Sequence, residues 1–283
     1  MRWLHCVSMT KSSIFEASPP LATALLLAAG RGERMRPLTD VQPKPLLPVQ
    51  GLPLMQWAMH GLQRGGVGHL LINTAWLGEQ IPAQFGAVLH TPGQTDMHLH
   101  YSPEGEDFGG ALETAGGIVR ALPRLADVFW VAAGDVFAPA FDFSMATYEA
   151  FKSSSALAHL WLVPNPPHNP SGDFGLSETG RALNLPKLPA GTVLSKGDVP
   201  RYTFSTIALY KRAFFEANWC DIPAGNPQGI KAPLAAMLRA AMDNGAVTAS
   251  LFSGAWTDVG TPERLAELNA APFVSPSSDR HAS

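Results

Sequence analysis

The stretch ATALLLAAGRGERMRPLT, residues 22–39, decides the fold, because a continuous apolar run passes directly into a loop of glycines and arginines. The run Ala24–Ala28 predicts a strand buried on both faces, as in a parallel sheet. Glycines after such a strand let backbone N–H groups approach phosphate oxygens closely. The basic residues that follow within fourteen positions are Arg31, Arg34, Arg36 and Lys44. Guanidinium and ammonium groups at this density predict a binding site for a triphosphate.

Two other interpretations of this loop compete with the phosphate site. A dinucleotide-binding fingerprint would require glycine where Met35 stands, and an acidic residue near Met55 to hold a ribose. Neither is present, and a proline-rich segment follows where the helix of that motif should run. The second alternative is a surface loop whose arginines are incidental. A Walker A loop is excluded, because the loop contains no Gly-Lys-Ser or Gly-Lys-Thr.

Outward from this stretch, predicted strands and helices alternate. Strands are expected at His69–Asn73, Met97–Tyr101 and Val128–Ala133, and helices from Pro53 onward and over Thr114–Leu122. This alternation predicts an α/β fold with a Rossmann-like, mainly parallel mixed sheet flanked by helices. In such a fold, ligands bind beyond the carboxyl ends of the strands.

The second half of the chain mixes strands with loops rich in proline and glycine. The expected elements are strands over Ala156–Val163, Thr203–Tyr210 and Val247–Phe252 and a helix over Ala232–Met242. They suggest an extension of the same sheet rather than an independent domain. We therefore expect a single domain over residues 21–272, an irregular extension over 1–20 and a flexible tail over 273–283.

Composition narrows the class of protein. The 283 residues are 46% hydrophobic and 15% charged, with a net charge of −3 and no block of like charges. Such a chain can bury a large core, and it lacks the basic face typical of nucleic-acid binders. The longest apolar stretch, Leu21–Ala29, is too short to span a bilayer. With only two cysteines and no clear signal peptide, a cytoplasmic protein without membrane or nucleic-acid partners is expected.

Two aspartates are candidate metal ligands. Asp135 follows the predicted strand Val128–Ala133, and Asp258 lies in the segment WTDVGTPE, residues 256–263, just before the last predicted helix. A carboxylate at a strand end can bind Mg²⁺ where loops line a cleft. Taken alone, either aspartate is more often a turn former or a helix N-cap.

The loop LAAGRGERMRPLT, residues 27–39, followed by PKPLLPV, residues 43–49, resembles the signature of the sugar-phosphate nucleotidyltransferases. That resemblance implies a fold of the GT-A type, in which Arg34 neutralises departing pyrophosphate and Lys44 the α-phosphate. It also implies that Asp135 and Asp258 hold Mg²⁺. The nucleotide contacts it implies are Leu27, Ala29, Gly30, Gly32, Arg34, Lys44, Asn73, Glu104, Glu113, Thr114 and Gly116. Judged from the residues alone, Glu104 and Glu113 could equally be solvated loop acids.

The segments AWLGEQI, YSPEGE with LET, and Gly172-Asp173-Phe174 are similar to one branch of that family. Members of this branch transfer a uridylyl group from UTP to N-acetylmuramate 1-phosphate in cell-wall recycling. The resemblance implies that Asp173, together with Lys231, contacts the sugar. Because a phosphate monoester is largely dianionic near neutral pH, no general base is required.

This chain departs from the patterns of its apparent relatives at three points. Residues 107–110 look like an insertion that could alter recognition of the base, and Thr206 stands where the branch has glycine. The Glu-Lys-Pro element common in relatives that use glucose 1-phosphate is absent from the second half, which disfavours that branch. The alternatives are a mannose- or glucose-1-phosphate nucleotidyltransferase using GTP or dTTP, and a catalytically silent sugar-nucleotide sensor. The scattered histidines, His168 among them, are interpreted as satisfied surface or edge residues. A monomer or weak homo-oligomer is expected.

Overall fold

The computed structural model describes residues 21–186 and 199–273. The predicted extension over residues 1–20 and most of the predicted tail, residues 274–283, lie outside the described residues. The strands are β1 (Ala22–Ala28), β2 (Pro48–Val49), β3 (Leu52–Pro53), β4 (His69–Thr74), β5 (Val88–Leu89), β6 (Met97–Pro103), β7 (Leu125–Ala133), β8 (Val136–Phe137), β9 (Ala158–Val163), β10 (Phe174–Leu176), β11 (Ala182–Leu183), β12 (Arg201–Lys211), β13 (Val247–Leu251) and β14 (Thr257–Asp258).

The helices are α1 (Leu54–Arg64), α2 (Gln80–Phe85), α3 (Glu104–Phe108), α4 (Glu113–Ala121), α5 (Met145–Ser153), α6 (Leu234–Asp243) and α7 (Pro262–Ala270). Short 3₁₀ turns are η1 (Glu33–Met35), η2 (Leu38–Asp40), η3 (Lys44–Leu46), η4 (Leu122–Arg124) and η5 (Arg212–Phe215). Three of these turns follow β1, where a dinucleotide-binding motif would have a long helix.

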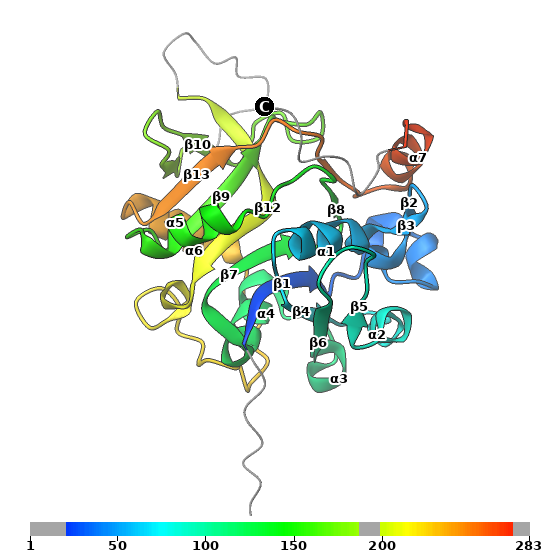
Figure 1. Cartoon of the computed structure of the whole chain (residues 1–283). Helices are drawn as coiled ribbons and strands as arrows, with labels where there is room; N and C mark the ends of the chain where they lie inside the picture. The colour runs from blue at the N-terminus through cyan, green and yellow to red at the C-terminus, as the bar shows by residue number, and fades with distance from the viewer. Residues whose placement is uncertain (1–20, 187–198, 274–283) are drawn as a thin grey trace, which may run out of the picture.

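Strand β1 lies in the middle of the sheet, with β4 and β7 parallel to it on either side (Figure 1). Beyond β4, β6 continues the parallel part. On the other side β12 pairs antiparallel with both β7 and β9, and β13 runs parallel to β9. The predicted mainly parallel mixed sheet is therefore confirmed, and the strands of both halves of the chain share it.

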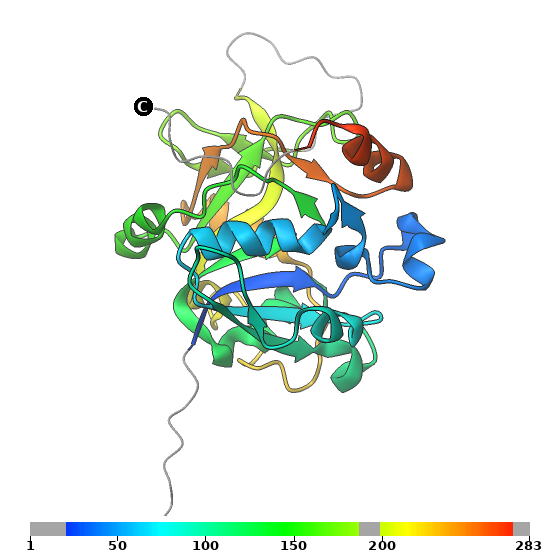
Figure 2. The ribbon, with the colours of Figure 1, turned by 45° about the vertical axis from the view of Figure 1, so that its right-hand side comes forward.

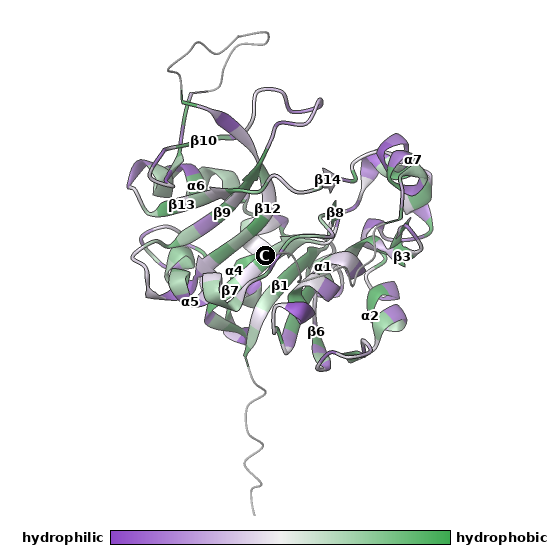
Figure 3. Cartoon of the chain, turned by 45° about the horizontal axis from the view of Figure 1, so that its top comes forward, coloured by the Kyte–Doolittle hydropathy of each residue, from purple (hydrophilic) through white to green (hydrophobic). Residues whose placement is uncertain are grey.

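Helices cover both faces of this sheet. Met55 and Met59 of α1 pack with Tyr148 of α5 against one face, and Figure 2 shows α1 lying alongside β1. Ile118 of α4 and Leu238 of α6 pack against the other face. The hydrophobic colour is concentrated on the central strands in Figure 3, as expected for strands that are buried on both sides. Among the described residues, no helix is both long enough and apolar enough to cross a bilayer.

A third apolar cluster lies apart from the two faces of the sheet, beside the loop that follows β1. Its buried members are Met35, Leu47, Val49, Leu54, Trp57, Phe137, Val259 and Leu265. They come from the loop and β2, from α1, from β8, and from α7 and the segment before it. The Trp57 indole N–H donates to the Val49 carbonyl oxygen at 3.1 Å. This cluster fixes the loop and the C-terminal segment relative to each other.

The apparent insertion, residues 107–110, forms the end of α3 and the turn after it. Arg120 of α4 pairs with Asp107, and its guanidinium lies 4.7 Å from the centre of the Phe108 ring. That ring contacts Gly229 so closely that any side chain at position 229 would collide with it. The inserted residues therefore pack onto α4 and the turn that precedes α6.

Candidate active site

A cleft of about 790 Å³ opens at the carboxyl ends of β1, β4 and β7, where a parallel sheet places its ligands. Ten of the predicted site residues line it: Leu27, Ala29, Gly30, Lys44, Asn73, Glu104, Glu113, Thr114, Asp135 and Asp173. The other predicted residues lie outside this lining: Gly32, Arg34, Gly116, Lys231 and Asp258. The structure thus brings most of the predicted residues to one cavity.

The glycines of the loop after β1 have different tasks. Gly30 has open space where a side chain would begin, so its backbone can approach a ligand in the cleft. Gly32 has a φ of +67°, and a Cβ there would lie 3.0 Å from the Thr39 side chain and 3.1 Å from Lys44 Cβ. Gly32 is therefore needed so that the loop can fold tightly around Lys44.

Lys44 extends from η3 into the cleft. The residue is only 8% exposed, and its Nζ lies 2.6 Å from Oδ2 of Asp135. This ion pair connects the loop after β1 with the turn after β7. An ammonium group held at this position can be shared between the carboxylate and an incoming phosphate.

Two of the four basic residues are engaged by the loop itself or by the side chain of Trp76 beside it. The Arg31 guanidinium lies 3.7 Å from the centre of the Trp76 ring and donates to the Thr39 carbonyl oxygen at 2.9 Å. Arg36 is exposed and pairs with Glu33 and Asp40. Their contacts indicate that Arg31 and Arg36 stabilise the loop. Of the four predicted phosphate-binding cations, Arg34 and Lys44 therefore remain.

Arg34, the third arginine of the loop, is exposed. It makes no hydrogen bond or ion pair with the residues that the structure describes, 21–186 and 199–273. A Cβ at Gly260 would lie 3.1 Å from Arg34 Nη2. The guanidinium therefore lies against the backbone just after Asp258. Glycine at position 260 leaves room for this approach.

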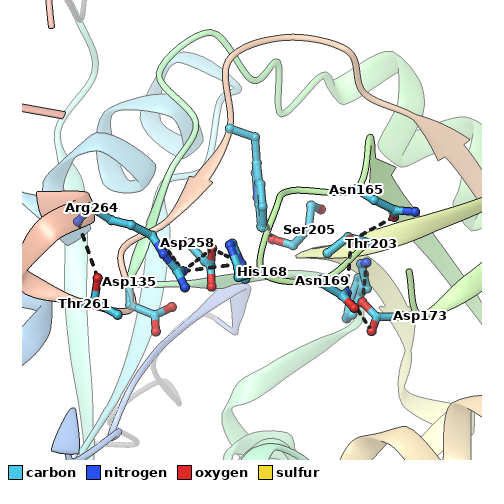
Figure 4. A network of polar contacts seen from close by, with 12 residues as sticks. Asp135, Asn165, His168, Asn169, Asp173, Thr203, Ser205, Asp258, Thr261 and Arg264 are labelled. Atoms are coloured by element: carbon cyan, nitrogen blue, oxygen red, sulfur yellow. Dashed lines mark hydrogen bonds and ion pairs between the residues drawn. The ribbon is translucent and has the colours of Figure 1, made fainter. Parts of the chain in front are cut away.

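The two predicted metal ligands are brought together by a small antiparallel ribbon. In this ribbon Asp258 of β14 pairs with Val136 of β8, and the Val259 N–H donates to the Asp135 carbonyl oxygen at 3.0 Å. Asp135 and Asp258 are thus neighbours across the ribbon, although they are far apart in the sequence. Figure 4 shows both side chains at one end of the polar network.

Asp258 has two cationic or polar partners of its own. Its Oδ1 lies 2.8 Å from Arg264 Nη1 and 2.8 Å from His168 Nε2 (Figure 4). His168 is exposed and its ring is paired, as expected for a satisfied surface residue, but its partner is a predicted metal ligand. Sequence patterns carry little signal for this contact, because His168 lies in an irregular proline-rich loop whose path depends on tertiary packing.

A buried network holds the far wall of the cleft. Asn73 accepts a hydrogen bond from Ala28 N–H at 2.8 Å and donates one to Glu104 Oε1 at 2.8 Å. The other oxygen, Glu104 Oε2, accepts from Leu112 N–H at 2.8 Å. Burial raises the pKa of Glu104, while the hydrogen bonds from Leu112 and Asn73 partly oppose the shift. Both residues line the cleft, but their polar atoms also join β1, β4 and the start of α4.

Asp173 is held in place at the other end of the cleft. Its Oδ2 accepts from Phe204 N–H at 2.8 Å, and its Oδ1 accepts from the Asn169 amide at 3.1 Å. The same Asn169 amide donates to Thr203 Oγ1 at 3.1 Å. Because Asn169 is next to His168, one short loop contacts both Asp258 and Asp173 (Figure 4).

Two predicted contact residues have other surroundings. Gly116 is buried inside α4, where a side chain would collide with the Ile230 carbonyl oxygen. Its small size is therefore explained by helix packing. Lys231 is exposed in the segment before α6 and lies outside the cleft lining.

The residues present fit a magnesium ion. Mg²⁺ is commonly held by one or two carboxylates together with substrate phosphates and waters, and it does not need a complete cage of side chains. The described residues contain no group of three or more His, Cys, Asp or Glu arranged to hold a metal. The neighbouring Asp135 and Asp258 match the sparser arrangement that Mg²⁺ prefers.

Comparisons with known proteins agree with this site. The sequence model of the Nucleotidyl transferase family matches residues 23–272. An N-acetylmuramate alpha-1-phosphate uridylyltransferase of Neisseria meningitidis is 42% identical over 253 residues, covering 87% of this chain and 96% of that protein. A mannose-1-phosphate guanylyltransferase of Mycobacterium tuberculosis is 28% identical, covering 85% of this chain and 61% of that protein. The chain therefore belongs to the nucleotidyl transferase family.

The fold agrees as well. A Bacillus anthracis protein assigned as a glucose-1-phosphate thymidylyltransferase, solved in complex with sucrose, aligns with a TM-score of 0.67. The alignment covers 90% of this chain and 98% of that one at 20% identity. At this identity, the likeness supports the fold alone.

Proposed function

We propose that this protein transfers a uridylyl group from UTP to N-acetylmuramate 1-phosphate, giving UDP-N-acetylmuramate and pyrophosphate. The observation that carries the proposal is the 42% identity to the uridylyltransferase over nearly the whole of both chains. Lys44, Asp135 and Asp258 are intact and adjacent, which argues against a silent sensor. A place in cell-wall recycling follows from the same resemblance.

The proposed reaction is one in-line displacement at the α-phosphorus of the triphosphate. An oxygen of the sugar 1-phosphate forms the new P–O bond, and the bond to the β-phosphate breaks, so that pyrophosphate leaves with its electron pair. The attacking phosphate is largely dianionic near neutral pH, so no proton has to be removed from it. Catalysis then depends on positioning and charge stabilisation.

In this scheme each charged residue has a separate task. Lys44 binds an α-phosphate oxygen and stabilises the negative charge that develops there. Arg34, exposed beside Gly260, binds the departing pyrophosphate. The glycine loop and the wall around Asn73 bind the nucleotide, while Asp173 at the opposite end orients the sugar.

Asp135 and Asp258 would hold the Mg²⁺, which when bound supplies further positive charge to the triphosphate. His168 and Arg264 both contact Oδ1 of Asp258, so they restrain the carboxylate and leave its second oxygen available. We therefore assign His168 a positioning role.

Replacing His168 with alanine is expected to lower Mg²⁺ affinity about tenfold, as is usual when a hydrogen-bond partner of a metal ligand is removed. Calorimetric titration of Mg²⁺ into the protein with bound UTP measures this directly, and the Mg²⁺ dependence of turnover should move in parallel. His90→Ala is the matched control, because His90 makes a comparable 2.7 Å contact with Asp96 on the surface. Equal Mg²⁺ affinities of the two variants would remove His168 from this role.

The proposed activity is tested by a matrix of four nucleoside triphosphates against several sugar 1-phosphates, with and without Mg²⁺. We expect pyrophosphate release to be fastest for UTP with N-acetylmuramate 1-phosphate, and to require Mg²⁺. Faster pyrophosphate release with GTP or dTTP would change the assigned base and sugar, but the protein would still be a nucleotidyltransferase. If every pair is inactive, the sensor alternative stands instead, and calorimetry with sugar nucleotides would then detect binding.

A further inference from the structure

Thr206 has a backbone conformation that its side chain disfavours. Its φ is +63°, in the left-handed region, and it is the sole β-branched residue among the described residues with a positive φ. Branching at Cβ makes this conformation costly, whereas glycine adopts it freely. Residues held in this way often mark functional sites, so the surroundings of the side chain decide what it does.

Neighbouring contacts hold the backbone in this conformation. The pairing of β12 with β9 is interrupted between Phe204 and Ala208, so the strand bulges around Thr206. Ser205, which is fully buried, donates from Oγ to the Trp161 carbonyl oxygen at 2.7 Å. Its own carbonyl oxygen accepts from the Trp256 indole at 3.1 Å. The bulge is thus anchored from both sides, and glycine would serve equally well at its centre.

The Thr206 side chain faces the cleft, whose lining it shares with Asp173, Phe174 and Phe204. Its hydroxyl donates to the Ser205 carbonyl oxygen at 2.6 Å. The hydroxyl proton is therefore already used, and the side chain adds volume to the cleft wall without a free donor. The strained threonine narrows the cleft at this point.

Several contacts hold the side chains at this end of the cleft. Asp173 is fixed by the Phe204 N–H and by Asn169, and the Phe174 and Phe204 ring centres are 6.3 Å apart. Closely packed side chains in the wall of a cleft select ligands by size, because a larger group finds no space there. The volume of the side chain at position 206 therefore affects which sizes of ligand fit at this end of the cleft.

We propose that Thr206 is a specificity-determining residue that limits the size of the acceptor sugar at the Asp173 end of the cleft. This inference rests on the proposed function, since it takes a sugar 1-phosphate to be the ligand that occupies this end. It goes beyond that function by naming the side chain that sets which acceptors fit.

Two substitutions separate side-chain volume from backbone strain. Thr206→Ala removes the volume and keeps a Cβ at positive φ, whereas Thr206→Gly removes both. With UTP and Mg²⁺, kcat/KM is measured for N-acetylglucosamine 1-phosphate, for N-acetylmuramate 1-phosphate, and for an N-acetylmuramate 1-phosphate whose lactyl carboxyl carries an added amino acid. We expect the ratio of the largest to the smallest acceptor to rise about tenfold in both variants, the scale expected when a pocket changes by one or two carbon-sized groups. The glycine variant should also melt at a higher temperature than the alanine variant.

Thr147→Ala on helix α5 is the control and should leave the acceptor ratio unchanged. A ratio within twofold of the parent protein in both Thr206 variants would overturn the assignment. Calorimetric titration of the same three sugar 1-phosphates provides a second readout that needs no turnover. If the parent protein is inactive with every acceptor, the proposed function fails. The proposal for Thr206 fails separately if the ratio of the dissociation constants of the largest and smallest acceptors is the same in the parent and in both variants.

Discussion

Replacing Asp135 with asparagine is expected to reduce turnover about a thousandfold while leaving the fold intact. A metal ion that stabilises charge in the transition state contributes several kcal/mol, and about 1.4 kcal/mol corresponds to each factor of ten. Asparagine keeps the size of the side chain and an oxygen that can accept the hydrogen bond from Lys44. The Asp135 side chain is 40% exposed, so folding does not depend on its charge.

The measurement is kcat for pyrophosphate release at saturating Mg²⁺, together with the melting temperature. Asp96→Asn is the matched control, because Asp96 is an exposed aspartate paired with a surface histidine. An Asp135 variant that retains turnover within a few-fold of the parent would remove this carboxylate from the metal site. A variant that loses turnover and also melts early would mean that Asp135 acts through the structure.

Replacing Glu104 with alanine is expected to cost roughly 3 kcal/mol of unfolding free energy and to lower the melting temperature by roughly 5–10 °C. The substitution leaves the Asn73 amide and the Leu112 N–H without their acceptor inside the protein. Because Asn73 also bonds the end of β1, nucleotide affinity should fall with stability. Glu106→Ala is the control on the same short helix, where Glu106 is exposed.

The same carboxyl group predicts a dependence on pH. Burial raises the pKa of Glu104 above its ordinary value of 4.5, so the folded protein binds this proton more tightly than the unfolded chain. The contribution of Glu104 to stability is therefore complete below pH 4.5 and declines as pH rises through the raised pKa. Denaturation across this window should show a flatter pH profile for Glu104→Ala than for Glu106→Ala. Parallel profiles would contradict the pKa shift.

The sequence was sufficient for the architecture because the signals involved are local. The apolar run Ala24–Ala28 and the strand Val128–Ala133 are continuous in sequence and are observed as neighbouring parallel strands. Strand ends then bring Lys44 and Asp135 to the same edge, as the general rule for parallel sheets requires. Features of this kind follow from periodicity and from the geometry of the sheet.

Other features depend on contacts that periodicity does not encode. The approach of His168 to Asp258 is set by how a proline-rich loop packs, and the bulge around Thr206 is set by Ser205 and Trp256. Gly116 was predicted to contact nucleotide, yet it lies where α4 packs against the segment containing Ile230. The amino-acid sequence alone does not reveal whether a glycine makes room for a ligand or for a neighbouring segment.

The third apolar cluster joins two parts of the chain that are synthesised at different times. It joins Met35, next to Arg34, with Val259, next to Asp258, so the first and last parts of the domain meet there. A ribosome delivers Arg34 and Lys44 long before the segment that carries Asp258 and α7. The growing chain can build most of the central sheet in that time, but it cannot complete the pair of carboxylates. Under the proposed mechanism, a growing chain therefore stays inactive until the segment that carries Asp258 has been synthesised.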